Sequence, residues 1–206
     1  MHRTIIAGSP RAQGRCAHLA QELFDACIEE RPGDGVSLVS VSGISVGGCI
    51  GCDACKQELP ADSDRAIALP EEGDPLRPQE RICAGDSQRH VCIIDDDMLE
   101  VRKHLDAADE LIAVVPVYFA GAPSQMKALL DRLQPYYWSD AREGEKRPLT
   151  LHVVGEGGDP HGIEPLIGCV RSALSVAGFS LVEVLDWRGR IDADGTIRED
   201  AREYAI

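Results

Sequence analysis

The amino-acid sequence predicts an α/β fold, a three-layer doubly wound sandwich in which a five-stranded parallel sheet carries helices on both faces. Short apolar segments alternate along the chain with longer segments whose apolar residues recur at helical spacing. Loops with the features of ligand-binding segments follow the first and third apolar segments. This favours the strand order 2-1-3-4-5, because ligands bind where the strand order reverses. We expect the 206 residues, 1–206, to form a single domain.

The first three elements follow from simple patterns near the N-terminus. Residues 4–7, Thr-Ile-Ile-Ala, predict a short buried strand. Residues 16–30 carry apolar side chains at helical spacing, and Pro32-Gly33 ends that helix. Residues 36–41 alternate apolar and polar side chains, which indicates a second strand.

The alternation of helix and strand continues through the second half of the chain. Acidic residues occupy the first turn of the next helix, where the helix dipole favours them. Pro123 and Ser124 begin a second helix, and Gly178 ends a third. The polar tail from Asp186 predicts an Asp-Ala-Asp-Gly turn and a short final helix. The expected elements are helix 96–108, strand 111–115, helix 123–137, strand 149–154, helix 163–177 and strand 181–185.

Residues 58–89 break this alternation. The segment holds Pro60, Pro70, Pro75 and Pro78 together with many acidic residues. Irregular loops of this length are uncommon inside compact domains. We therefore interpret the segment as an irregular insertion that packs over one edge.

The charge of the chain limits its partners. A net charge of −14 argues against nucleic acid or an anionic membrane as a general partner. The N-terminal sequence lacks the long apolar stretch of a secretory signal, so we expect a cytoplasmic protein. Arg3, Arg11 and Arg15 nevertheless lie in a stretch, 1–21, without Asp or Glu. Either this is a chance distribution or it marks an anion site.

The loop after the first strand has the features of a phosphate site. It contains Ser9, Arg11, Gly14, Arg15 and Cys16 and opens a helix, whose N-terminus carries partial positive charge. A hydroxyl, backbone N–H groups and two guanidinium groups could bind a phosphate monoester there. The loop matches neither the Walker A pattern nor GxGxxG. The alternative is an ordinary turn with solvated arginines.

The loop after the third strand could contact a flat ring. It consists of Pro116, Val117, Tyr118, Phe119, Ala120 and Gly121. Adjacent aromatic residues are unusual in a chain with 3 Phe, 4 Tyr and 2 Trp. Their rings could stack on a heterocycle, and the small residues would let the backbone approach it. The alternative is that these aromatic side chains cap the core.

The eight cysteines include Cys49, Cys52 and Cys55 at steps of three. In a reducing compartment, such clustering indicates a metal site or a redox pair. A [4Fe–4S] cluster commonly uses closely spaced cysteines, and zinc also accepts four thiolates. The third possibility is that the cysteines bind no metal.

The two loops together resemble a known family. Ser9-Pro10-Arg11 followed by Gly14, and Pro116-Val117-Tyr118-Phe119 followed by Pro123 to Arg132, are similar to the NAD(P)H-dependent FMN reductase group of flavodoxin-like proteins. The cysteine run resembles the iron–sulfur flavoprotein branch of that group. The likeness covers most of residues 3–185 except the insertion.

The resemblance implies FMN as the cofactor and assigns roles to the loops. Ser9, Arg11 and residues 14–16 would hold the phosphate, residues 116–121 would line the isoalloxazine ring, and Gly155 would begin a third flavin-side loop, Gly155-Glu156-Gly157-Gly158. This chain has Arg15 and Cys16 where relatives usually have Asn and then Ser or Thr. Since a thiol is a poor donor, we expect Cys16 to contribute its backbone N–H and Arg15 to compensate electrostatically.

The resemblance also implies a fourth cysteine. In the iron–sulfur branch, a fourth cysteine followed by an Asp-Asp pair completes the ligand set, and Cys92 before Asp95-Asp96 matches it. Cys83 is a competing candidate. A [4Fe–4S] cluster, zinc, and free thiols with a Cys52–Cys55 redox couple all stay open. The remaining cysteines, Cys16, Cys27 and Cys169, are interpreted as small buried residues.

Other residues receive lesser roles. We interpret Lys127 and Asp131 as a surface ion pair, and His161 as a residue that could approach the flavin. Relatives are dimers or tetramers, and Tyr136, Tyr137 and Trp138 are candidates for a contact between subunits in a homodimer or homotetramer.

The sequence thus predicts an FMN-dependent oxidoreductase. It would pass electrons from NAD(P)H or a reduced iron–sulfur protein to a quinone, another small molecule or a protein, with chemistry supplied by the flavin. The alternatives are an electron carrier without turnover of its own, and a thiol- or metal-based redox sensor on a flavodoxin-like scaffold.

Overall fold

The computed structural model describes residues 1–59, 90–158 and 160–206. The predicted insertion, apart from Glu58 and Leu59, lies outside the described residues, and so does Cys83. The single domain over 1–206 and the packing of the insertion therefore stay predictions.

The described chain contains strands and helices in the predicted alternation. They are β1 His2–Ala7, α1 Arg15–Glu30, β2 Gly35–Ser40, η1 Ala54–Lys56, α2 Met98–Ala107, β3 Glu110–Pro116, α3 Ser124–Asp131, α4 Gln134–Trp138, η2 Asp140–Arg142, β4 Arg147–Val154, α5 Glu164–Val176, β5 Phe179–Asp186 and β6 Arg202–Glu203.

One sheet organises the fold, with the order β2-β1-β3-β4-β5-β6. The first five strands in this order are mutually parallel, which confirms the α/β class and the order 2-1-3-4-5. The prediction of five strands was incomplete, since β6 adds a sixth, antiparallel strand beside β5.

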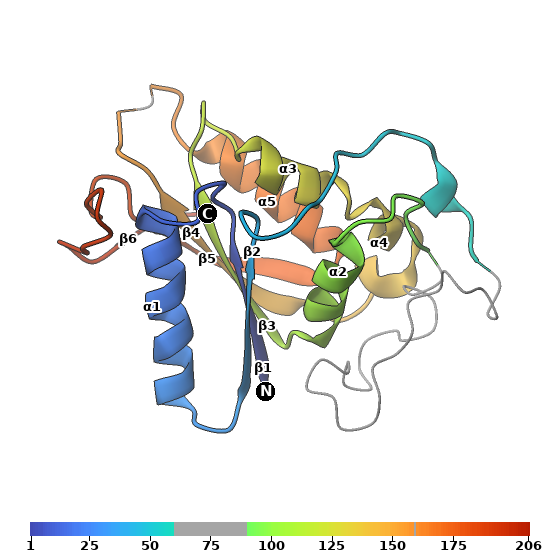
Figure 1. Cartoon of the computed structure of the whole chain (residues 1–206), viewed down its shortest axis with the longest axis horizontal. Helices are drawn as coiled ribbons and strands as arrows, with labels where there is room; N and C mark the ends of the chain where they lie inside the picture. The colour runs from blue at the N-terminus through green and yellow to red at the C-terminus, as the bar shows by residue number, and fades with distance from the viewer. Residues whose placement is uncertain (60–89, 159) are drawn as a thin grey trace.

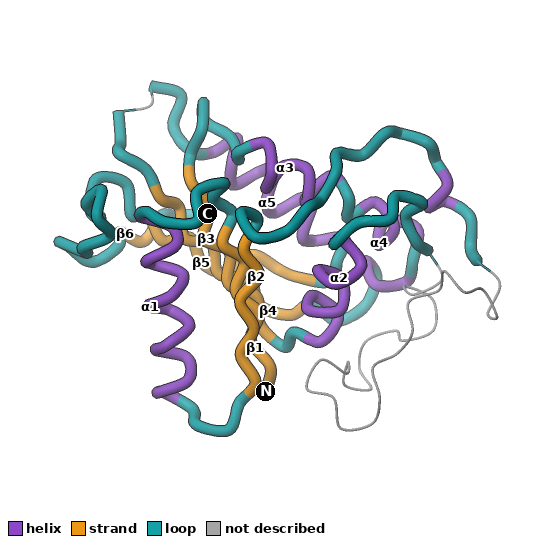
Figure 2. Tube along the Cα trace, viewed as in Figure 1, coloured by secondary structure: helices purple, strands orange, loops and turns teal. Residues whose placement is uncertain are grey.

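The sheet separates two apolar layers. Figures 1 and 2 show α1 on one face of the sheet and α2, α3, α4 and α5 on the other. Alternate residues of β3 point to opposite faces: Leu111, Ala113 and Val115 pack with α2 to α5, whereas Ile112 and Val114 pack with α1. Several described strand residues are fully buried, as expected for a parallel sheet covered on both faces.

The predicted helix 123–137 was wrong as a single element. It is divided into α3 and α4 at Arg132 and Leu133. Pro135 is the physical reason, because it has no N–H to donate to the carbonyl of Asp131 and its ring crowds that carbonyl in a continuous helix. Likewise, α2 begins at Met98 rather than at residue 96, since the Asp96 carboxylate accepts the backbone N–H of Met98.

The tail after β5 also differs from the prediction. The Asp-Ala-Asp-Gly turn forms, with the Gly195 N–H donating to the Asp192 carbonyl at 3.0 Å. The expected final helix does not form among the described residues, and β6 occupies its place. The Tyr204 N–H donates to the Val184 carbonyl at 2.9 Å, so the tail pairs with backbone that β5 would otherwise leave open at the sheet edge.

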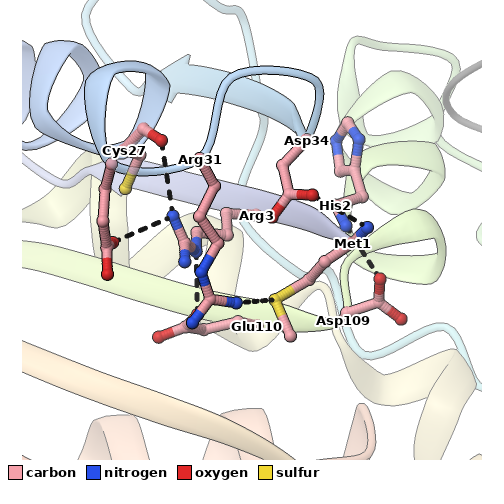
Figure 3. A network of polar contacts seen from close by, with 9 residues as sticks. Met1, His2, Arg3, Cys27, Arg31, Asp34, Asp109 and Glu110 are labelled. Atoms are coloured by element: carbon pink, nitrogen blue, oxygen red, sulfur yellow. Dashed lines mark hydrogen bonds and ion pairs between the residues drawn. The ribbon is translucent and has the colours of Figure 1, made fainter.

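A polar network fastens the amino-terminal ends of the strands (Figure 3). The Arg3 side chain is buried and reaches Glu110 at 3.1 Å, Glu30 at 3.4 Å and the Cys27 carbonyl at 3.5 Å. The backbone N–H of His2 donates to the Asp109 carboxylate at 2.7 Å. The charged side chains at the amino-terminal ends of β1 and β3 therefore pair with one another, and these contacts join the two strands to α1.

None of the described helices is long and apolar enough to cross a membrane. The cytoplasmic location stays a prediction.

His152 on β4 is a buried histidine held in its neutral form. Its Nδ1 accepts a hydrogen bond from the Trp187 indole N–H at 2.9 Å, and the two rings stack with their centroids 6.1 Å apart. Burial lowers the pKa of His152 from 6.5 to about 4. Only the neutral ring can accept the Trp187 N–H, so protonation opposes folding.

This arrangement predicts acid sensitivity. Between pH 6.5 and 4 the unfolded chain binds a proton that folded His152 excludes, so stability falls as pH falls, by about 3 kcal/mol in total. We expect His152→Asn to flatten the pH dependence of the free energy of unfolding by about that amount. Urea unfolding of both proteins at several pH values measures it, and parallel curves would contradict the assignment.

Candidate functional site

A cavity of about 980 Å³ lies where β1, β3 and β4 end. It brings together every residue predicted for the flavin site except Ala120 and Gly121. The lining residues are Ser9, Arg11, Gln13, Gly14, Arg15, Cys16, Pro116, Val117, Tyr118, Phe119, Val154, Gly155, Glu156, Gly157, Gly158, Pro160, His161, Arg188 and Ala193.

The sheet itself positions these loops. The strand register continues into the loops: the Gly8 N–H donates to the Val114 carbonyl at 2.8 Å, and the Val117 N–H donates to the Val154 carbonyl at 2.9 Å. The first residues after β1 and β3 are thus fixed to the neighbouring strand. The loops begin from a common, rigid edge.

One side of the cavity is built for an anion. Gly14 is the N-cap of α1, with φ of 121°, and no side chain caps the helix, so the first-turn amides stay available. The Ser9 hydroxyl oxygen accepts the Arg11 N–H at 3.2 Å, which folds the loop back on itself. In the part of the chain that the structure describes, no carboxylate pairs with Arg11.

Arg15 is held differently from Arg11. Its Nε donates to the Ile191 carbonyl at 2.8 Å, and its terminal nitrogen lies 3.1 Å from the Glu156 carboxylate. The guanidinium therefore connects the helix to the tail and to the loop after β4. Burial raises the pKa of the neighbouring Cys16 thiol to about 12, so this side chain is neutral.

The aromatic side of the cavity is a strained turn. Phe119 and Ala120 both have positive φ, 51° and 60°, and Tyr118 and Gly121 exchange backbone hydrogen bonds at 2.9 and 3.0 Å. Phe119 is fully exposed. Ala120 and Gly121 do not line the cavity, and the Ala120 side chain is buried. They shape the loop that presents Tyr118 and Phe119.

Sequence reasoning missed the contribution of the tail to this cavity. Arg188 and Ala193 line it, and Arg188 packs over Gly155, with its Cγ 3.3 Å from where a Cβ would stand. Asp186 holds the Arg188 guanidinium at 2.8 Å. The polar tail sequence gave no signal of this approach. His161, expected to approach the flavin, does line the cavity.

A second cavity, of about 280 Å³, gathers the four predicted metal ligands. Cys49, Cys52, Cys55 and Cys92 all line it, and all are free thiols. Burial, Cys92 and the other two thiols raise the pKa of Cys55, so the sulfurs influence one another electrostatically. Within the described residues, however, no three His, Cys, Asp or Glu side chains already stand in an arrangement that could hold a metal ion.

The second cavity has structural neighbours that the sequence did not single out. Arg132, Lys56 and Trp138 line it beside the thiols, and the Lys56 ammonium lies 5.3 Å from the Trp138 ring centroid. The two cavities share no lining residue. They are separate sites on one chain.

The lesser predictions had mixed outcomes. Lys127 and Asp131 form the expected ion pair, with both side chains about half-exposed. Tyr136 was wrongly placed on the surface, because it is buried and its hydroxyl donates to the Asp106 carboxylate at 2.6 Å. Tyr137 and Trp138 are exposed.

The other cysteines lie apart from the thiol cavity. Cys16 and Cys27 are buried as expected, whereas Cys169 is only partly buried.

Curated relatives of this chain include iron–sulfur flavoproteins. One from Methanocaldococcus jannaschii is 32% identical over 130 residues, which are 63% of this chain and 50% of that protein. One from Methanosarcina thermophila is 30% identical over 132 residues, 64% of this chain and 52% of that protein. The chain thus spans about half the length of these curated relatives.

Solved structures share the fold at low identity. A putative quinone reductase from Klebsiella pneumoniae is 18% identical, with a TM-score of 0.52 over 95% of this chain and 79% of that chain. An FMN-dependent NADH-azoreductase from Bacillus anthracis, in complex with FMN, is 11% identical, with a TM-score of 0.53 over 91% and 87% of the two chains.

The family model described as NADPH-dependent FMN reductase matches residues 1–168, which is well over half of the chain. The resemblance noted in the loops after β1 and β3 is thereby confirmed, and the protein belongs to the NADPH-dependent FMN reductase family.

Proposed function

We propose that this protein is an FMN-dependent oxidoreductase that passes electrons from NAD(P)H or a reduced iron–sulfur protein to a quinone, another small molecule or a protein. The observation that carries the proposal is the cavity at the ends of β1, β3 and β4, which has cationic and amide donors on one side and aromatic rings on the other. Membership of the family supports the same cofactor.

The anion side of the cavity fits the phosphate of FMN. The uncapped N-terminus of α1 offers backbone N–H groups and partial positive charge, and Ser9 can donate its hydroxyl proton. Arg11 adds a guanidinium without a carboxylate partner among the described residues. Gly14 leaves open space where a side chain would stand, so a ligand can approach the helix closely.

The aromatic side fits a flat ring. Tyr118 and Phe119 would stack on the isoalloxazine, while Gly155, Gly157 and Gly158 on the loop after β4 let backbone approach it. When bound, the flavin supplies the electron-transfer chemistry. The residues of this chain would hold and orient the ring, and we assign none of them a role in acid–base catalysis.

At the thiol cavity we propose a [4Fe–4S] cluster held by Cys49, Cys52, Cys55 and Cys92. Four thiols are the donor set that such clusters use, and all four line one cavity. Such a cluster would exchange single electrons with the flavin or with an external partner. Zinc is the competing occupant, since it also accepts four thiolates.

One sample tests both cofactors. Anaerobic purification followed by an absorbance spectrum and analysis of iron, sulfide and zinc reports flavin and cluster together. Rapid bleaching of the flavin by NADH or NADPH supports the enzyme and rejects the carrier without turnover. Failure to retain FMN would favour the thiol-based sensor instead.

The assembly state belongs to the same proposal. Tyr137 and Trp138 are exposed on α4 and would contribute to a contact in a homodimer or homotetramer.

The phosphate assignment predicts the effect of Arg11→Ala. We expect FMN to bind about 10- to 100-fold more weakly, because a hydrogen bond to a charged group contributes about 1.5–3 kcal/mol. Riboflavin, which lacks the phosphate, should bind equally to both proteins. Titration of each apoprotein with FMN and with riboflavin, followed by flavin fluorescence, measures the affinity of the two proteins for the two ligands. The control is Arg171→Ala, which removes the same charge from an exposed position on α5 that does not line the cavity. If Arg11→Ala leaves the FMN affinity unchanged, the phosphate lies elsewhere.

The strained turn predicts opposite effects on stability and binding. A non-glycine residue at positive φ costs about 1–2 kcal/mol, and asparagine adopts this conformation more readily than phenylalanine. We therefore expect Phe119→Asn to raise the free energy of unfolding by about 0.5–1 kcal/mol. It should also weaken FMN binding by about 2- to 10-fold through loss of stacking.

Urea unfolding and flavin titration measure the two effects. Phe119→Tyr, which keeps both the ring and the strain, should match the wild type in both. A Phe119→Asn protein that keeps its full FMN affinity would remove Phe119 from the ring site.

A further inference from the structure

Arg132 is a buried cation beside the thiol cavity. It follows the last residue of α3, its side chain is 1% exposed, and it lines the cavity with the four cysteines. A buried guanidinium requires partners because its desolvation is costly. The hydrogen-bond partners of Arg132 therefore indicate its structural role.

The guanidinium joins the two cysteine-bearing segments. One terminal nitrogen donates to the Gly47 carbonyl at 3.0 Å, two residues before Cys49. The other donates to the Ile94 carbonyl at 3.4 Å, two residues after Cys92. A single side chain from α3 thus contacts the backbone on both sides of the site.

Asp96 completes this link. Its two oxygens accept from the two terminal nitrogens of Arg132 at 2.7 and 3.0 Å, and one of them also accepts the Gly47 N–H at 2.9 Å. Burial acts to raise the pKa of Asp96, but hydrogen bonds from Arg132, Gly47 and Met98 hold it below its usual value. The carboxylate is therefore ionised, and the pair is a bidentate, charge-assisted one.

Two further ties join the segments. Ser45 and Asp97 exchange hydrogen bonds at 2.7 and 3.2 Å, and His90 contacts the Cys55 carbonyl at 3.0 Å. Cys49 and Cys52 themselves are exposed. The Arg132–Asp96 pair is one buried connection between the two cysteine-bearing segments, and the buried His90 provides another.

The charge of Arg132 is balanced by its partner. The Asp96 carboxylate neutralises the guanidinium, so the pair can act on the site through its geometry rather than through net charge. The Nε of Arg132 is buried and makes no hydrogen bond within the described structure.

We propose that Arg132 is a positioning residue of the four-cysteine site: with Asp96 it holds Cys92 opposite the Cys49–Cys55 segment. This inference rests on the proposed metal-binding role of these cysteines. It assigns to Arg132 a part that is neither a metal ligand nor a flavin contact.

Cobalt binding tests the inference. Reduced, metal-free protein is titrated anaerobically with Co²⁺, which reports thiolate ligation by its charge-transfer absorbance. We expect Arg132→Gln to bind Co²⁺ about 10- to 100-fold more weakly than the wild type. Arg132→Lys, which keeps the charge but cannot bridge both segments, should lie between them. Arg171→Gln is the control and should bind like the wild type, and equal affinity in Arg132→Gln would overturn the inference.

A second measurement needs no metal. Diamide oxidises two neighbouring thiols to a disulfide and takes up the two electrons and two protons. Peptide mapping by mass spectrometry then quantifies disulfides between Cys92 and the other three cysteines. We expect such disulfides in the wild type and at least a fivefold loss in both Arg132 variants, with near-UV circular dichroism confirming that each variant is folded.

The two measurements separate the possible failures. If the wild type binds no Co²⁺ but Arg132→Gln loses the Cys92 disulfides, the metal role fails and the positioning role stands. If Cys92 forms no such disulfides in the wild type, or forms them equally in the variants, the positioning role is overturned whatever the metal result.

Discussion

The ligand end of this molecule depends on the hydrogen-bonded register of β1, β3 and β4. Parallel pairing aligns Ala7 with Val114 and Pro116 with Val154, so three loops leave the sheet at one edge. The pairing extends one residue further, through the Gly8 and Val117 N–H groups, and fixes the start of each loop. A shift of one strand by one residue would reverse every side chain on it and disperse the cavity. Sites built on such rigid elements hold their geometry more closely than sites built on loops alone.

The thiol cavity lacks this support and obtains its order in another way. Its cysteines come from the irregular chain after β2 and from the segment before α2, and neither segment pairs with the sheet. Buried side-chain contacts replace the strand ladder, chiefly those of Arg132 and Asp96. Such a site can gather its thiols without presetting their geometry, and a metal would then complete the arrangement, since binding and local folding are coupled when no preformed site exists.

Local patterns predicted the parts of this structure that depend on local chemistry. Strand and helix periods predicted most of the elements, and the loops after β1 and β3 favoured the order of the sheet and supplied many of the residues at the first cavity. The loop that begins at Gly155 was expected from the family resemblance. Pro135 was also a local signal, and it explains the break that the predicted helix 123–137 omitted. The missed features join distant segments: Arg188 reaches Gly155 from the tail, and Arg132 reaches Gly47 from α3. No pattern within either segment specifies such partners, because they depend on tertiary packing.

The electrostatics of the first cavity indicate that an anion belongs there. The chain has 35 acidic and 21 basic residues, yet no acidic residue lies in the first turn of α1. Arg11 and Arg15 stand instead beside that helix N-terminus, where its dipole repels cations. Glu156 relieves this repulsion for Arg15, while Arg11 has no carboxylate partner among the described residues. Placing like charges together opposes folding, and such a conflict between local energetics and the rest of the fold is characteristic of functional sites. A bound phosphate would remove the conflict, since its charge neutralises the arginines and its oxygens accept from the open amides of α1.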